Sequence, residues 1–107
     1  MMGLAMAGAM LLASPVAAAT PDSALSELQA RDQQLFTIGW RLASTNAPFC
    51  ERAVPSLGLS VLDAGGFGDP SAIRRQLGLS GDLAVGAVAP GSPAAMAGVT
   101  VGDTLVA

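Results

Sequence analysis

Residues 79–107, LSGDLAVGAVAPGSPAAMAGVTVGDTLVA, carry the strongest indication of the fold in this chain. Apolar residues alternate with small residues along 83–88, which predicts a β-strand that carries small side chains on one face. Pro90-Gly91 predicts a turn, and Ser92-Pro93 predicts the N-cap and first position of a helix that closes at Gly98. Since this helix is barely longer than one turn, it must be held by a sheet.

A second turn, at Gly102-Asp103, predicts entry into another strand over residues 104–107. The string GSPAAMAG and this Gly-Asp turn stand at the spacing found in PDZ domains of bacterial extracytoplasmic proteins, which the chain resembles over residues 56–107. The resemblance implies an α+β fold, an incomplete PDZ-like small β-barrel or sandwich with short helices. Because the closing helix and strands of such a domain would follow Ala107, we expect a C-terminally truncated domain over residues 55–107.

Leu57-Gly58-Leu59 resembles the short carboxylate-binding loop of PDZ domains, where successive backbone N–H groups point at the C-terminal carboxylate of a bound peptide. Glycine suits such a loop because its amides can converge on an anion with no Cβ in the way. The resemblance implies that Leu57, Gly58 and Leu59 supply amides, and that Ser60 and Val61 begin a strand that pairs with the peptide by β-augmentation. An ordinary strand start explains the same residues equally well.

The segment between this strand, expected within residues 55–62, and the strand at 83–88 is expected to hold a loop and a helix. The sequence AGGFG at 64–68 predicts a flexible loop. Asp69-Pro70 predicts the N-cap and first position of a short helix, and Gly78 is expected to take the left-handed position after its end.

Residues 20–54 are expected to form an amphipathic helix and a linker, with the helix starting at Thr20-Pro21 and ending before Pro48. Phe36 and Trp40 are expected to pack on a neighbouring domain, a ligand-stacking surface being the alternative. Beside them runs an apolar stripe that needs the following domain, a partner chain or further sequence to cover it. The members of the stripe are Leu25, Leu28, Leu35, Ile38 and Leu42.

Residues 1–19 resemble a secretory signal peptide, with an apolar stretch, Pro15 and a run of small residues that predicts cleavage after Ala18 or Ala19. An uncleaved membrane anchor is the alternative. Cleavage would make the protein periplasmic or secreted, whereas an uncleaved segment would attach it to the membrane. The single Cys50 is expected to be structural, either half of a disulfide or a buried thiol.

The composition excludes several classes of chemistry. The chain has no His, which rules out Ser-His-Asp and Cys-His catalysis and His-containing zinc sites within it. The formal net charge is −3, and no basic patch accompanies an aromatic platform, so nucleic acid is not an expected partner. We therefore expect no catalytic residue, metal or cofactor in this chain.

The expected function is that of an exported PDZ-like module that binds C-terminal or extended peptides. The alternative is the non-catalytic N-terminal part of an exported peptidase, because similar PDZ segments accompany zinc metallopeptidases and serine proteases, with the catalytic domain beyond residue 107. A third possibility is a nonfunctional fragment, which predicts no cooperative thermal transition.

Overall fold

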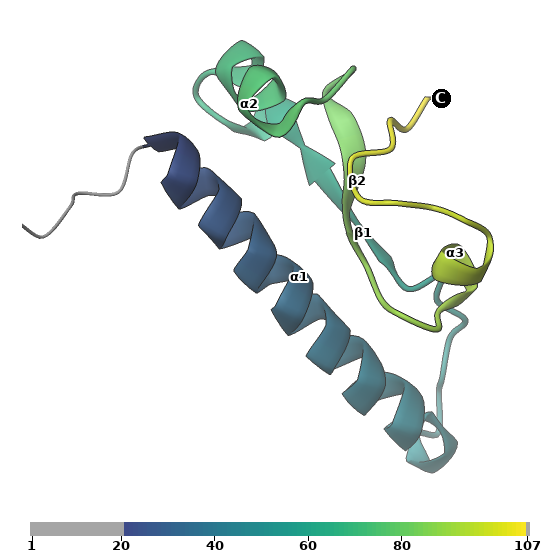
Figure 1. The fold of residues 1–107 in the computed structure, drawn as a ribbon. Coiled ribbons are helices and arrows are strands. Elements are labelled where there is room, and N and C mark those ends of the chain that lie inside the picture. Colours follow the sequence, from purple (N-terminus) through teal and green to yellow (C-terminus); the bar gives the residue numbers. More distant parts are fainter. Residues whose placement is uncertain (1–20, 107) are drawn as a thin grey trace, which may run out of the picture.

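The computed structural model describes residues 21–106 of the 107-residue chain, so the predicted signal peptide lies outside the described residues. These residues form a mixed α+β arrangement around a two-stranded antiparallel sheet (Figure 1). In chain order the elements are α1 (Pro21–Asn46), η1 (Ala47–Phe49), β1 (Leu59–Asp63), η2 (Ala64–Gly66), α2 (Pro70–Leu77), β2 (Leu83–Val88) and α3 (Pro93–Met96).

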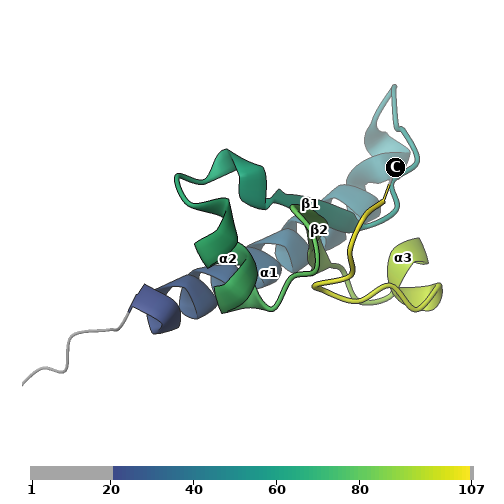
Figure 2. The same cartoon turned by 90° about the horizontal axis from the view of Figure 1, so that it is seen from above.

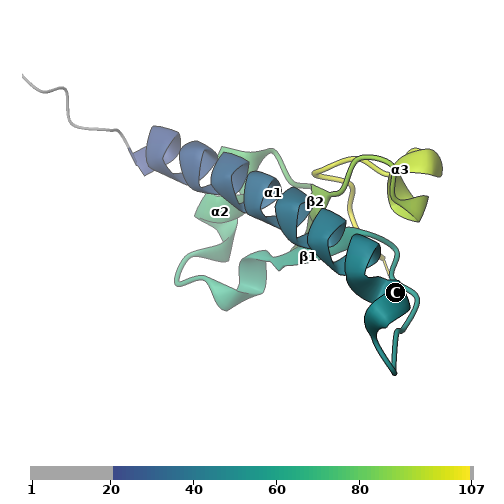
Figure 3. The same ribbon diagram turned by 90° about the horizontal axis from the view of Figure 1, so that it is seen from below.

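The long helix α1 is confirmed, but the predicted apolar stripe is not the face that packs. Half-buried Gln33, Phe36, Thr37 and Trp40 lie toward the rest of the fold. Four of the five stripe residues are exposed, and the sheet, α2 and α3 lie together on one side of the helix (Figures 1 and 3). The expected packing of Phe36 and Trp40 is therefore observed, whereas most of the leucine stripe stays uncovered by the described residues.

A polar side chain, Gln33, ties α1 to the sheet. Its Nε2 donates to the Val88 carbonyl at 2.8 Å, and its Oε1 accepts from the Val88 N–H at 2.9 Å. The side-chain amide thus pairs with β2 as a neighbouring strand would, and satisfies both peptide groups of a strand-end residue. This requirement explains why a face containing glutamine, rather than the leucine stripe, meets the sheet.

The sheet contains an irregularity that the alternating pattern did not predict. Ser60 pairs with Ala87 and Val61 with Val85, which leaves Gly86 without a partner as a β-bulge. A Cβ at residue 86 would lie 3.3 Å from both Leu62 Cβ and Ser60 Oγ, so the bulge sits where the strands approach closely. The bulge breaks the alternation, because Val85 and Ala87 oppose the consecutive residues Val61 and Ser60.

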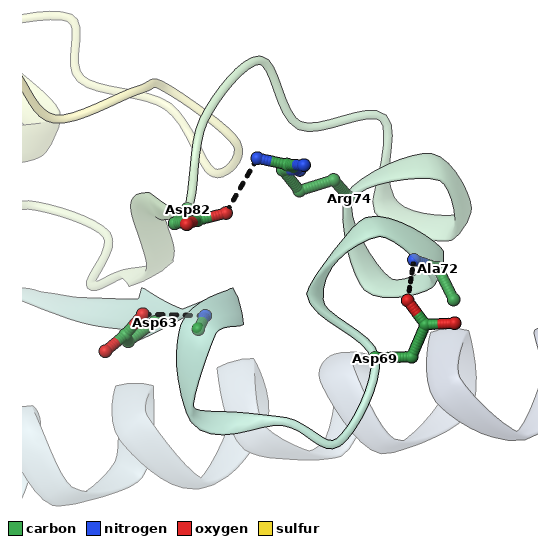
Figure 4. A network of polar contacts seen from close by, with 6 residues as sticks. Asp63, Asp69, Ala72, Arg74 and Asp82 are labelled. Carbon is green, nitrogen blue, oxygen red and sulfur yellow. Dashed lines mark hydrogen bonds and ion pairs between the residues drawn. The ribbon is translucent and has the colours of Figure 1, made fainter.

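The connection from β1 to β2 is held by a chain of local polar contacts (Figure 4). The prediction of a flexible loop at 64–68 is wrong for its first half, because η2 forms there and the Asp63 carboxylate accepts from the Gly65 N–H at 2.8 Å. The α2 prediction is confirmed: Asp69 accepts from the Ala72 N–H, and Gly78 adopts φ of 65°. Arg74 pairs with Asp82 at 2.9 Å and links α2 to the start of β2.

The helix α3 and the residues after it close the far edge of β2. Ser92 caps α3 through its Oγ as predicted, and Gly98 follows it with φ of 83°. The strand expected over 104–107 is reduced, within the described residues, to one bridge between Thr104 and Ala84. The buried core is built mainly from small side chains, and Val85 is the largest apolar member. Such a core contributes little hydrophobic stabilisation for its number of residues.

Candidate functional site

The five candidate residues form one continuous segment at the start of β1. Leu57 precedes the strand and is exposed, Gly58 is buried, and Leu59, Ser60 and Val61 are the first residues of β1. Val61 remains 54% exposed although it lies within the sheet. The structure therefore brings these residues together at an accessible place.

Gly58 is held by close packing as well as by its backbone angle. Its φ is 75°, and a Cβ there would lie 2.2 Å from Ser92 Cβ and 3.3 Å from Trp40 Cη2. Real Cβ atoms do not approach so closely, so only glycine fits between the cap of α3 and the ring of Trp40. This packing gives Gly58 a structural role.

The candidate loop is attached directly to the segment that leads into α3. The Gly58 carbonyl accepts from the Ala89 N–H at 2.8 Å, and the Leu57 carbonyl accepts from the Ala94 N–H at 2.9 Å. On the other side, the Gly58 N–H donates to Ser56 Oγ at 3.3 Å. The GSPAAMAG string thus positions the loop, although more than 30 residues separate the two in the sequence.

The outer edge of β1, the edge that faces away from β2, carries a regular set of peptide groups. Leu59 is opposite Val88 and Val61 is opposite Val85. Val88 and Val85 use their own N–H and C=O groups on the far side of β2, toward Gln33 and toward residues 102–103. In an antiparallel ladder, two opposite residues either hydrogen-bond to each other or both direct their N–H and C=O groups away from the partner strand. The N–H and C=O of Leu59 and Val61 therefore point away from β2.

Asp63 continues the same series. It is opposite Leu83, whose carbonyl accepts from the Leu105 N–H on the far side of β2. The outer edge thus offers peptide groups at residues 59, 61 and 63, and among the described residues no strand pairs with it. An unpaired edge of this kind is a template for another extended segment.

Two hollows lie between α1 and β1. One, of about 340 Å³, lies beside the candidate loop and is lined by Phe36, Gly39, Trp40, Ala43, Ser56 and Leu59. The other, of about 130 Å³, lies where the N-terminal half of α1 meets Ser60, Val61 and Leu62. Because successive parts of α1 meet β1 in reverse order, the helix runs antiparallel to the strand (Figure 2).

The chemistry of this region is that of binding surfaces. In residues 21–106, His, Cys, Asp and Glu do not gather in any group of three that could hold a metal ion. Cys50 is an exposed free thiol, so the prediction of a buried thiol is wrong for this structure. None of the helices in the described part of the chain is long and apolar enough to cross a membrane.

Sequence reasoning missed two contributors to the region. Gln33 had no signal, because an isolated glutamine on a helix is usually solvated. The contact between Trp40 and Gly58 was also missed, although a lone tryptophan beside an apolar stripe indicated packing. Both contacts depend on how α1 lies across the sheet, which periodicity along one helix does not reveal.

Comparison with known proteins adds no assignment. No family model matches the chain, and no curated protein or solved structure matches it significantly.

Proposed function

We propose that this chain is an exported peptide-binding module with a PDZ-like fold, in which β1 pairs with the extended C-terminal segment of another protein. The observation that carries the proposal is the outer edge of β1, where the peptide groups of Leu59, Val61 and Asp63 point away from β2. Peptides recognised by β-augmentation bind through such groups, and side-chain hollows beside the strand supply selectivity.

The proposed place for the peptide carboxylate is the segment Leu57-Gly58-Leu59. A peptide that pairs antiparallel with β1 ends beside the first residues of the strand. The outward N–H of Leu59 is one donor for the carboxylate. The Gly58 N–H is a second donor, once it gives up its 3.3 Å hydrogen bond to Ser56 Oγ. The freed hydroxyl of Ser56 can then donate to the carboxylate as well.

The hollow between α1 and the loop is the proposed pocket for the last side chain of the peptide. The large apolar side chains of Phe36, Trp40 and Leu59 line it. An apolar C-terminal residue would bury its surface there, at about 25 cal/mol per Å². We therefore expect peptides ending in an apolar residue to bind better than peptides ending in Asp, Glu or Lys.

The order of the elements supports the PDZ-like assignment, and the first residues of the chain support export. The segment from β1 to α3 contains the two capped helices that the sequence predicts, with Asp69 at the start of α2 and Ser92 at the start of α3. The apolar residues 1–19, with Pro15 before a run of small residues, support passage through the secretory route.

The test is a titration of a C-terminal peptide library against the chain, followed through Trp40, the single tryptophan, which lies beside Gly58. The best peptide is then compared with its C-terminal amide and with versions that carry one N-methyl group at a time. We expect amidation to weaken binding and N-methylation to do so at every second residue. Equal affinity of acid and amide would refute the carboxylate site, and an effect without that alternation would refute β-augmentation.

A further inference from the structure

The uncovered stripe of α1 is a second apolar surface. It reaches the proposed peptide site only at its N-terminal end, where Leu28 lines the hollow beside Ser60 and Val61. Leu28, Leu35, Ile38 and Leu42 are between 49% and 69% exposed. Leu28, Leu35 and Leu42 recur every seven residues, and Ile38 follows Leu35 by three, which is the spacing of a coiled-coil seam. Because the sheet, α2 and α3 lie on the other side of α1 (Figure 1), a second helix can approach along the stripe.

We propose that two copies of this chain pair through the stripe with their α1 helices antiparallel. The inference is independent of peptide binding. The occupant is identified by the charges beside the seam: Glu27, Gln34 and Arg41 each stand one residue before a stripe leucine. In an antiparallel pair centred near Gln34, Glu27 of each copy faces Arg41 of the other, so the dimer has two ion pairs.

The opposite orientation lacks this complementarity. In a parallel pair, the flanking position of one helix faces the position five residues later on its partner. Glu27 would then face Asp32 of the second copy, and Arg41 would face uncharged Asn46. The charge pattern therefore favours antiparallel pairing over parallel pairing.

The shape of the stripe agrees with a two-fold arrangement. A hollow of about 270 Å³ lies near its N-terminal end, lined by Ala24, Glu27, Leu28 and Arg31. A hollow of about 240 Å³ lies near its C-terminal end, lined by Ile38, Arg41, Leu42, Thr45 and Asn46. In the antiparallel pair, the first hollow of each copy faces the second hollow of the other. The apolar side chains at their rims can then insert as knobs into holes.

Two other charges lie near the proposed seam. Arg31 stands on the stripe itself and forms an ion pair with Glu27 of its own helix, so its aliphatic stem can cover apolar surface while its charge stays in solvent. Asp32 lies on the other flank, near the two-fold axis, where it approaches Asp32 of the second copy. This repulsion opposes the dimer, so Asp32→Asn should strengthen dimerisation.

The test is sedimentation velocity of the full chain across micromolar concentrations. We expect a monomer–dimer equilibrium in which Arg41→Glu weakens the dimer about three- to thirtyfold, as expected for two exposed ion pairs. The double variant Glu27→Arg, Arg41→Glu should restore it. Arg75→Glu, the same charge change on exposed α2, should leave it unaltered. Leu35→Ser should abolish dimerisation while leaving the monomer folded, since Leu35 is already 69% exposed.

The proposal would be overturned by a monomer at every concentration, by a dimer that tolerates both Leu35→Ser and Arg41→Glu, or by a dimer that Asp32→Asn weakens. The orientation has its own test, oxidation of Gln34→Cys in a Cys50→Ser background. A disulfide across the two-fold axis is expected, and its absence from a proven dimer would refute antiparallel pairing. Protection of a Leu35→Cys thiol from alkylation in a monomeric sample would assign the stripe to another segment and also overturn the proposal.

Discussion

Replacing Gly58 by alanine should destabilise the protein more than the same change at another glycine with equal φ. Gly58 and Gly91 both have φ of 75°, so each substitution carries the left-handed strain of about 1–2 kcal/mol. Reduced freedom of the unfolded chain offsets that strain by about 0.4–1 kcal/mol in both variants. The two sites differ in space, because a Cβ at residue 91 meets no atom within 4 Å and one at residue 58 lies 2.2 Å from Ser92 Cβ.

The overlap at Gly58 cannot be relieved by rotating a side chain, since Ser92 Cβ is fixed to the backbone at the cap of α3. Overpacking of this kind costs about 1–3 kcal/mol. We therefore expect Gly58→Ala to lower the free energy of unfolding by about 2–4 kcal/mol and Gly91→Ala by about 1 kcal/mol. Urea denaturation followed by far-UV circular dichroism measures both values.

A second substitution tests the cause. Ser92→Gly removes the Cβ and Oγ that the new methyl group would meet, and replacing a serine N-cap by glycine costs only a few tenths of a kcal/mol. Gly58→Ala combined with Ser92→Gly should thus be more stable than Gly58→Ala alone. If Gly58→Ala and Gly91→Ala prove equally destabilising, or if Ser92→Gly gives no rescue, the argument from close packing is wrong.

Two further substitutions test the contacts that hold α1 and α2. Gln33→Ala removes both hydrogen bonds to Val88 and should lower the free energy of unfolding in urea by about 1–3 kcal/mol. Gln34→Ala, at the exposed neighbouring residue, should change it by no more than about 0.5 kcal/mol. Equal effects would show that the Gln33 amide does not anchor α1. Asp69→Ala removes the cap of α2 and should lower the free energy of unfolding by about 0.5–2 kcal/mol. Asp82→Ala loses a half-exposed ion pair of at most about 1 kcal/mol, so it should destabilise the protein less. A lower melting temperature for Asp82→Ala than for Asp69→Ala would contradict the capping argument.

Local signals were enough to predict most of the elements. Helix α2 begins at Pro70 after the cap Asp69 and ends before Gly78 as predicted, because caps, proline and left-handed glycine act within a few residues of one another. The same reasoning located α3. It failed over 64–68, where the Asp63 carboxylate orders the first residues of a glycine-rich segment, and at 104–107, where the expected strand reduces to a bridge at Thr104.

The candidate site was predictable only as a segment. Residues 57–61 could be selected from the Leu57-Gly58-Leu59 pattern and from its distance along the sequence to β2. The direction of the β1 peptide groups could not, because it depends on the register with β2 and on the bulge at Gly86. The pocket beside the loop could not be predicted either, because it needs Phe36 and Trp40 from a helix about 20 residues earlier.

The sequence alone predicts where α1 and α2 begin and end and where α3 begins, since those choices are made by neighbouring residues. It also determined that α1 has an apolar stripe. Tertiary structure alone decided which side of α1 meets the sheet: pairing between Gln33 and Val88 turns the leucine stripe outward. The same packing sets a second requirement for glycine at residue 58, in addition to its positive φ. In both cases the reason is contact between residues far apart in the chain, whose energies no local pattern contains.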